Sequence, residues 1–140
     1  MLSLQGRGAI ISGTRRVGAE VVRRLAREGV CPAIVYRSSR AAAEELLQSV
    51  RGRVQRACLV QADLTVEAEV QRAVEEAARQ LGDLSFCVNL ASDYPRVAFD
   101  QLDGRAWDEG MAGARAAYLL ALHAARRMSS MMPRSARAAD

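Results

Sequence analysis

The chain has 140 residues with a net charge of +4, and half of its residues are apolar. This size and composition fit one globular domain without a membrane-spanning run, and the N-terminal stretch lacks a signal-peptide pattern, so we expect a cytoplasmic protein. Scattered arginines with few aromatics argue against a nucleic-acid partner, and three cysteines outside any Cys/His cluster argue against a metal site.

Strand-like and helix-like segments alternate along the chain. Apolar runs of strand length alternate with longer stretches whose apolar residues recur at helical spacing. We expect Pro32 at the start of the second strand, because proline cannot donate within a ladder. Strands are predicted over 8–12, over 33–36, within 54–64 and over 84–90. The first helix is predicted from 17 to Gly29, and the second over 39–50 with Ser38 or Ser39 as its N-cap. The third is predicted from a Thr65 cap to about Leu81, stopped by Gly82, and the last from about 105 to 128.

This alternation predicts an α/β fold of Rossmann type, a parallel sheet covered by helices on both faces. Right-handed crossovers make the expected strand order 3-2-1-4. The predicted domain covers 1–128 and is incomplete, because no fifth strand follows. Pro133 is expected to end the last helix, and the small, polar residues 129–140 predict a disordered tail. The last helix carries an apolar stripe of Trp107, Met111, Ala114, Tyr118 and Leu122.

The loop after the first strand, "ISGTRRVGAE" over 11–20, carries the first functional signal. At the carboxyl end of a first parallel strand, the next helix points its N-terminal amides into a crevice that suits phosphate. Gly13 allows a tight turn there, and Gly18 allows close packing or close approach of a phosphate. A plain strand-to-helix turn remains the alternative interpretation.

The stretch after the second strand, "VYRSSR", carries the second signal. Rossmann domains that bind NAD usually place an acidic residue here to hold the ribose 2′-hydroxyl. This chain has Arg37 followed by Ser38, and a guanidinium pairs with a 2′-phosphate in a forked geometry. Arg15 or Arg16 can approach the same phosphate from the opposite side. The pattern favours NADP over NAD, unless Arg37 is only a solvated residue at the end of a strand.

Four motifs stand in order: "SGTRRVG", "YRSS", "ADLT" and "NLAS". With them the chain, from about residue 6 to 128, resembles the N-terminal part of the short-chain dehydrogenase/reductase family, and "RRVG" and "NLASDYPR" most resemble its pteridine-reductase-like branch. The resemblance implies that Asp63 and Leu64 lie against adenine, although Asp63 alone also fits a helix cap. The implied NADP(H)-binding residues are Gly13, Thr14, Arg15, Arg16, Val17, Gly18, Arg37, Ser38, Asp63, Leu64, Asn89, Ala91 and Ser92.

The chain also departs from this family. The glycine loop lacks the middle glycine and is one residue shorter, and Leu90 replaces a usual asparagine. The family's proton donor is a tyrosine followed four residues later by lysine, and this chain contains no lysine. The position of the family's helix asparagine falls at Ala114. We therefore predict no catalytic residue, and we expect His123 on a helix surface or interface and Ser129 and Ser130 in the tail.

Three hypotheses follow. The first is an NADP(H)-binding portion of a reductase for carbonyl-type or pteridine-type substrates that does not itself catalyse hydride transfer; the polar tail suggests truncation or a shifted reading frame. The second is an active reductase with an atypical proton donor, such as tyrosine paired with arginine. The third is an interaction module without cofactor. Self-association is expected through the long helix over 105–128 or the open edge of the sheet.

Overall fold

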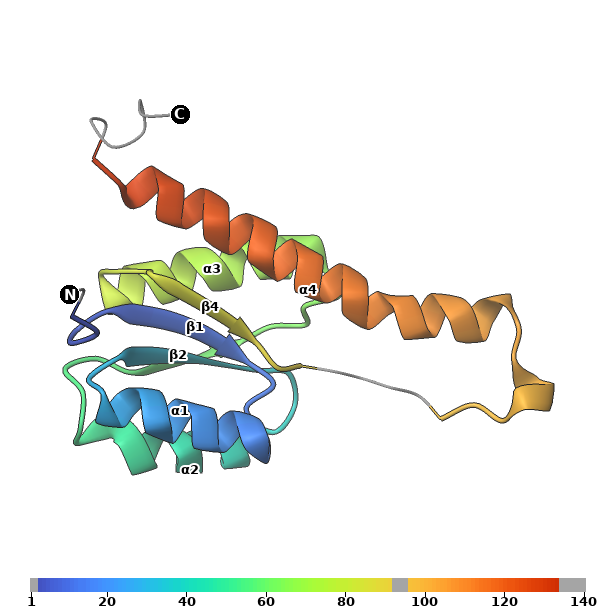
Figure 1. Ribbon diagram of the computed structural model, residues 1–140, viewed down its shortest axis with the longest axis horizontal. Coiled ribbons are helices and arrows are strands. Elements are labelled where there is room, and N and C mark those ends of the chain that lie inside the picture. Colours follow the sequence, from blue (N-terminus) through green and yellow to red (C-terminus); the bar gives the residue numbers. More distant parts are fainter. Residues whose placement is uncertain (1–2, 92–95, 134–140) are drawn as a thin grey trace.

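The computed structural model describes residues 3–91 and 96–133 (Figure 1). Strands and helices alternate through these residues, as the sequence pattern predicts. The strands are β1 (Gly8–Ser12), β2 (Cys31–Tyr36), β3 (Cys58–Gln61) and β4 (Phe86–Asn89), and the helices are α1 (Val17–Arg27), α2 (Arg40–Arg51), α3 (Glu67–Leu81) and α4 (Gly104–Met131), with a 3₁₀ turn, η1 (Phe99–Gln101), before α4.

The four strands form one parallel sheet in the order β3-β2-β1-β4, which confirms the predicted fold class and strand order. Helices α1 and α2 cover one face, and α3 and α4 cover the other (Figure 1). Successive residues of β1 point to opposite faces of the sheet and so belong to different core clusters. Ile10 belongs to the core beneath α3 and α4, whereas Ala9 and Ile11 belong to the core beneath α1 and α2. Because both faces are covered, β1 is apolar at every position but its last.

Pro32 lies inside β2 rather than at its first residue. The strand begins at Cys31, whose N–H donates to the Arg7 carbonyl over 2.8 Å, on the β1 side. Backbone groups of successive strand residues face opposite neighbours, so Pro32 faces the β3 side. The β2–β3 register starts only at Ala33 opposite Cys58, one residue later. The missing N–H of Pro32 therefore costs no ladder hydrogen bond.

The start of α3 differs from the predicted cap. Val66, not Thr65, is the N-cap residue, and the helix begins at Glu67. Thr65 does not cap the helix, because its N–H and its hydroxyl donate to Asp63 Oδ1 over 2.9 and 2.6 Å. Gly82 ends the helix in the left-handed conformation with φ +68°, as predicted.

Helix α4 is longer than predicted. It begins at Gly104, where the N-cap Asp103 accepts the Ala106 N–H over 2.8 Å, and it continues to Met131 instead of ending at Met128. Met128 and Met131 pack against the core cluster beneath α3 and α4, and this packing keeps the last turn on the protein. Ser129 and Ser130, expected in the tail, are therefore helical. The rest of the predicted tail, residues 134–140, lies outside the described residues.

The buried face of α4 is not its apolar stripe. Leu119, Leu120 and Ala124 are buried, whereas Trp107 is 69% exposed and Tyr118 63% exposed. Figure 1 shows the reason: the C-terminal half of α4 lies along α3 and β4, and its N-terminal half extends past the sheet. The stripe therefore faces solvent on the projecting half of the helix.

Candidate functional site

The carboxyl ends of the four strands surround a cleft of about 570 Å³. The loops after β1, β2, β3 and β4 form its walls, and one face of α4 closes a side. Nine of the sequence-predicted residues line it, while Arg16, Val17 and Gly18 do not and Ser92 lies outside the described residues. The nine are Gly13, Thr14, Arg15, Arg37, Ser38, Asp63, Leu64, Asn89 and Ala91.

Both glycines of the first loop occupy places that exclude a side chain. Gly13 has φ +71°, and a Cβ on it would collide with the backbone of Leu90 and Ala91. A Cβ on Gly18 would collide with the Gly13 carbonyl. The β1–α1 loop thus packs tightly against the β4 loop, and its backbone forms the floor of the cleft.

Arg16 is the one described non-glycine residue with positive φ, at φ +48° and ψ −110°. The Gly18 N–H donates to the Arg15 carbonyl over 2.9 Å, so Arg16 is the first central residue of a tight turn whose dihedrals normally call for glycine. Arg15 lines the cleft, and Arg16 is exposed beside it. Helix α1 begins directly after this turn without a side-chain cap among the described residues. Backbone N–H groups and two guanidinium groups therefore gather at one helix N-terminus, an arrangement that favours anions.

Arg37 and Asp63 follow the two neighbouring strands β2 and β3 into the cleft. The Arg37 carbonyl accepts a hydrogen bond from Gln61 Nε2 over 3.1 Å, across the end of the β2–β3 ladder. Hydrogen bonds from the hydroxyl and the N–H of Thr65, with a weaker effect from the charge of Arg37, hold the pKa of the Asp63 carboxyl below its ordinary value. This wall of the cleft therefore holds an ionised carboxylate beside a guanidinium.

Asn89 and Ser12 join the ends of β4 and β1. The Ser12 hydroxyl donates to Asn89 Oδ1 over 2.5 Å, and the same oxygen accepts the Ala91 N–H over 3.3 Å. These bonds fix the orientation of the amide, because its oxygen already accepts two hydrogen bonds. The amino group of Asn89 is then the half of the side chain suited to donate to a ligand.

Helix α4 contributes cleft residues that the sequence did not indicate. Small residues on one of its faces line the cleft with Glu109, whose carboxylate pairs with Arg105 over 2.9 Å. The periodicity of α4 predicted a helix but not which face meets the loops. Most of the other missed lining residues lie at or just after the carboxyl end of a strand, so the predicted strand ends could have indicated them. The missed residues are Ser12, Val35, Tyr36, Ser39, Ala42, Ala43, Ala62, Thr65, Leu90, Glu109, Ala112, Gly113 and Ala116.

His123 is buried at a helix interface, one of the two places expected for it. Its Nε2 lies 3.0 Å from Glu67 Oε1, and it is only 8% exposed. Two more polar contacts join α4 to α3 and its preceding loop: Arg115 donates to the Thr65 carbonyl over 2.8 Å, and Arg127 pairs with Glu75 over 3.0 Å. His123 thus belongs to the helix–helix interface.

The described residues form neither a metal-binding cluster nor a membrane-spanning helix. Residues 3–91 and 96–133 hold no group of three or more His, Cys, Asp or Glu side chains placed to bind a metal ion. In the same ranges, no helix combines the length and the hydropathy needed to cross a bilayer.

Comparison with known proteins gives a consistent match. The family model for short chain dehydrogenase matches residues 8–137. A short-chain dehydrogenase/reductase structure from Serratia marcescens is 31% identical with a TM-score of 0.82, covering 91% of this chain and 53% of that one. A Burkholderia cenocepacia short chain dehydrogenase in complex with NADP is 32% identical with a TM-score of 0.81, covering 89% and 52%.

A curated relative, the hydroxynaphthalene reductase of Aspergillus fumigatus, is 33% identical over 89 residues, covering 63% of this chain and 33% of its own length. The chain therefore spans about half the length of the two solved structures and a third of the fungal reductase.

Proposed function

The chain belongs to the short-chain dehydrogenase family, and we propose that its cleft binds NADP(H) in preference to NAD(H). The observation that carries this proposal is Arg37 at the carboxyl end of β2, on the wall of the cleft, where an NAD-binding site usually has a carboxylate. Arg15 lines the same cleft from the β1 loop, so two guanidinium groups border it. A 2′-phosphate needs such charge-assisted donors, and a 2′-hydroxyl does not.

The rest of the cleft suits the other parts of the dinucleotide. The glycine floor at Gly13 leaves room for a diphosphate beside the start of α1. Leu64 offers an apolar surface for adenine, and Asn89 offers an amide donor on the β4 side. The solved Burkholderia relative was crystallised with NADP, which supports the same ligand class.

Titration with NADPH and NADH tests the binding proposal. We expect Arg37→Ala to weaken NADPH binding by about tenfold while NADH binding changes little, because one charge-assisted contact is lost. Arg24→Ala is the matched control, since it removes the same charge from the far end of α1, where Arg24 pairs with Glu28 over 2.9 Å. Equal affinity of the wild type for both dinucleotides would contradict the preference, and absence of binding to either would contradict the proposal.

For the reaction, we propose reduction of carbonyl-type or pteridine-type substrates by the whole enzyme of which such a cofactor half is part. Bound NADPH supplies a hydride. Residues 1–140 contain no lysine to follow a tyrosine proton donor at the family spacing, so we propose that this stretch alone binds cofactor without turnover. NADPH oxidation with a panel of ketones and dihydropteridines tests this, and robust turnover by the 140-residue chain would refute it. Such turnover would favour an atypical proton donor instead.

We propose further that two copies associate through the projecting half of α4. Trp107, Met111 and Tyr118 lie exposed along one stripe, and Phe99 is 91% exposed on η1 just before the helix. An exposed apolar stripe of this kind suits a self-complementary contact between two copies.

Sedimentation of the wild type and of Trp107→Ser/Tyr118→Ser tests this contact. The double variant should be monomeric under conditions in which the wild type is dimeric, because two exposed aromatic anchors are lost without disturbing the core. A monomeric wild type would refute the proposal. The three free cysteines suit a reducing compartment, and we propose a cytoplasmic location.

A further inference from the structure

Gln61 extends the β2–β3 ladder by one side-chain hydrogen bond. The backbone pairing of the two strands ends where the Ala62 N–H donates to the Tyr36 carbonyl over 3.0 Å. Arg37 is the first residue after β2, and the Gln61 amide donates to its carbonyl over 3.1 Å. The side chain of Gln61 thus ties the end of β3 to the residue that follows β2.

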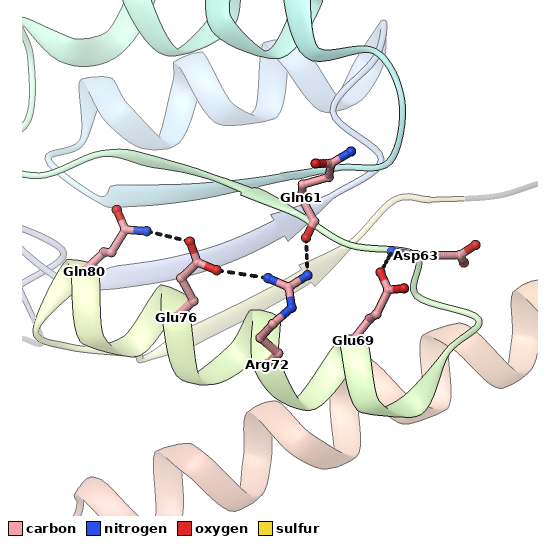
Figure 2. A network of polar contacts seen from close by, with 6 residues as sticks. All are labelled: Gln61, Asp63, Glu69, Arg72, Glu76 and Gln80. Carbon is pink, nitrogen blue, oxygen red and sulfur yellow. Dashed lines mark hydrogen bonds and ion pairs between the residues drawn. The ribbon is translucent and has the colours of Figure 1, made fainter.

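A polar network on α3 holds Gln61 from the other side (Figure 2). Arg72 Nη2 donates to the Gln61 carbonyl over 2.5 Å, and Arg72 Nη1 donates to Glu76 Oε2 over 3.1 Å. Gln80 Nε2 donates to the second oxygen of Glu76 over 3.0 Å. The backbone of Gln61 is therefore tied to α3 while its side chain is tied to Arg37.

The end of β3 is held a second time by α3, two residues later. The Asp63 N–H donates to Glu69 Oε2 over 2.7 Å, and Figure 2 shows this contact beside the Arg72 network. Asp63 lines the cleft, whereas Gln61 is not among its lining residues. Gln61 is thus fixed behind the wall of the cleft, in contact with the backbone of a residue that forms the wall.

We propose that Gln61 is a positioning residue for dinucleotide specificity, holding the backbone of Arg37 so that its guanidinium meets the 2′-phosphate. The inference rests on the proposed NADP(H) binding and extends it to a residue outside the cleft. Arg37 follows directly after β2, and the Gln61 side chain bonds its backbone carbonyl from the end of β3. A donor that fixes its carbonyl therefore limits the directions that its long side chain takes, which lowers the entropy lost on binding.

Gln61→Met tests the inference, because methionine keeps the length of the side chain and its neutral charge but removes the donor. We expect the ratio of NADH to NADPH dissociation constants to fall by about fivefold, with NADPH binding weakened and NADH binding nearly unchanged. Gln80→Met is the matched control, since it makes the same change at the far end of the same network. Both side chains are exposed, so neither variant is expected to unfold.

Combination with Arg37→Ala separates positioning from a structural effect. In the Arg37→Ala background, Gln61→Met should leave the ratio unchanged, because the residue that it positions is gone. An unchanged ratio in Gln61→Met alone, with the wild type preferring NADPH, would overturn this inference and leave the proposed function standing. A further fall of the ratio in the double variant, or an equal fall in Gln80→Met, would also overturn it. A wild type that binds neither dinucleotide would overturn the proposed function, and this inference with it.

Discussion

The sheet has two edge strands, and they differ in how well the chain covers them. On β3, Cys58 and Val60 are buried at 6% and 1% exposure beneath α3 and α4, while Leu59 is half-buried and Gln61 exposed. On β4, every residue from Phe86 to Asn89 is only half-buried. An apolar groove of about 440 Å³ lies beside β4, between α4, the end of α1 and the N-terminal segment.

The difference shows where this stretch of chain completes its own core and where it does not. Parallel strands are normally covered on both faces and paired along their edges. Both edge strands lack a neighbour on one side. The β3 residues that face α3 and α4 are nevertheless covered, whereas β4 leaves apolar surface exposed along its whole length. The candidate cofactor cleft joins the two regions, because its walls come from the ends of all four strands.

The largest expected contrast is between Val60→Ala on β3 and Val88→Ala on β4. The two variants remove the same atoms, but only Val60 is fully buried. We expect Val60→Ala to lower the free energy of unfolding by about 2 kcal/mol and Val88→Ala by about half as much. Urea denaturation of both variants measures the difference. Equal losses would mean that the β4 edge is as well covered as the β3 edge, as self-association over the groove would produce.

Thiol labelling gives a second contrast, between Cys87 on β4 and Cys58 on β3. Burial raises the pKa of Cys58 to about 11, with a smaller contribution from Glu76, and also raises the pKa of Cys87. Cys87 is partly exposed, so we expect it to react with a small alkylating reagent at least about tenfold faster than Cys58.

Peptide mapping by mass spectrometry distinguishes the labelled cysteines. All three cysteines should react at similar rates in urea, which controls for intrinsic reactivity. Faster labelling of Cys58 in the folded protein would show that the β3 side opens more readily than the β4 side.

The smallest contrast is in acid sensitivity, between Asp83 before β4 and Asp63 after β3. Burial raises the pKa of Asp83, but hydrogen bonds from the Gly8 N–H and the Ser85 hydroxyl outweigh it, so its pKa is lowered, as is that of Asp63. A carboxyl whose pKa is lower in the folded state than in the unfolded state stabilises the protein at pH values above the unfolded-state pKa, which is about 4. This stabilisation is lost as the pH falls through the folded-state pKa.

Asp83→Asn should therefore cost about 1 kcal/mol at neutral pH and flatten the acid side of the stability profile, since Asp83 bonds the backbone of β1 over 2.7 Å. Asp63→Asn should cost less, because its partner Thr65 is exposed and solvent screens the site. Urea midpoints between pH 2.5 and pH 7, a range that brackets the ordinary carboxyl pKa, measure both. A larger cost for Asp63→Asn would contradict the order.

The sequence predicted the fold well where local chemistry decides the structure. The bounds of β1, the stop at Gly82 and the strand order follow from apolar runs, glycine and crossover handedness. The cap of α3 was mispredicted because a nearer acceptor, Asp63, competes for Thr65. The buried face of α4 was missed because apolar spacing marks a face without saying what covers it.

The candidate site was predictable in its loops and not beyond them. Arg37 and Asp63 lie just after the ends of strands. Because ligands of parallel α/β sheets bind at the carboxyl ends of the strands, the predicted strands already indicate that these residues lie at the cleft. Glu109 reaches the cleft only through the packing angle of α4, which no local pattern encodes. The role of Gln61 depends on the register of two strands that lie 24 residues apart, so it becomes visible only once they are paired.

The backbone of Arg16 has a consequence for which residues this loop can accept. At φ +48° and ψ −110° a glycine is relaxed, whereas any side chain carries a conformational cost of about 1–3 kcal/mol. Stability alone would therefore select glycine at this position. The arginine carries that conformational cost, and its side chain lies exposed beside the cleft.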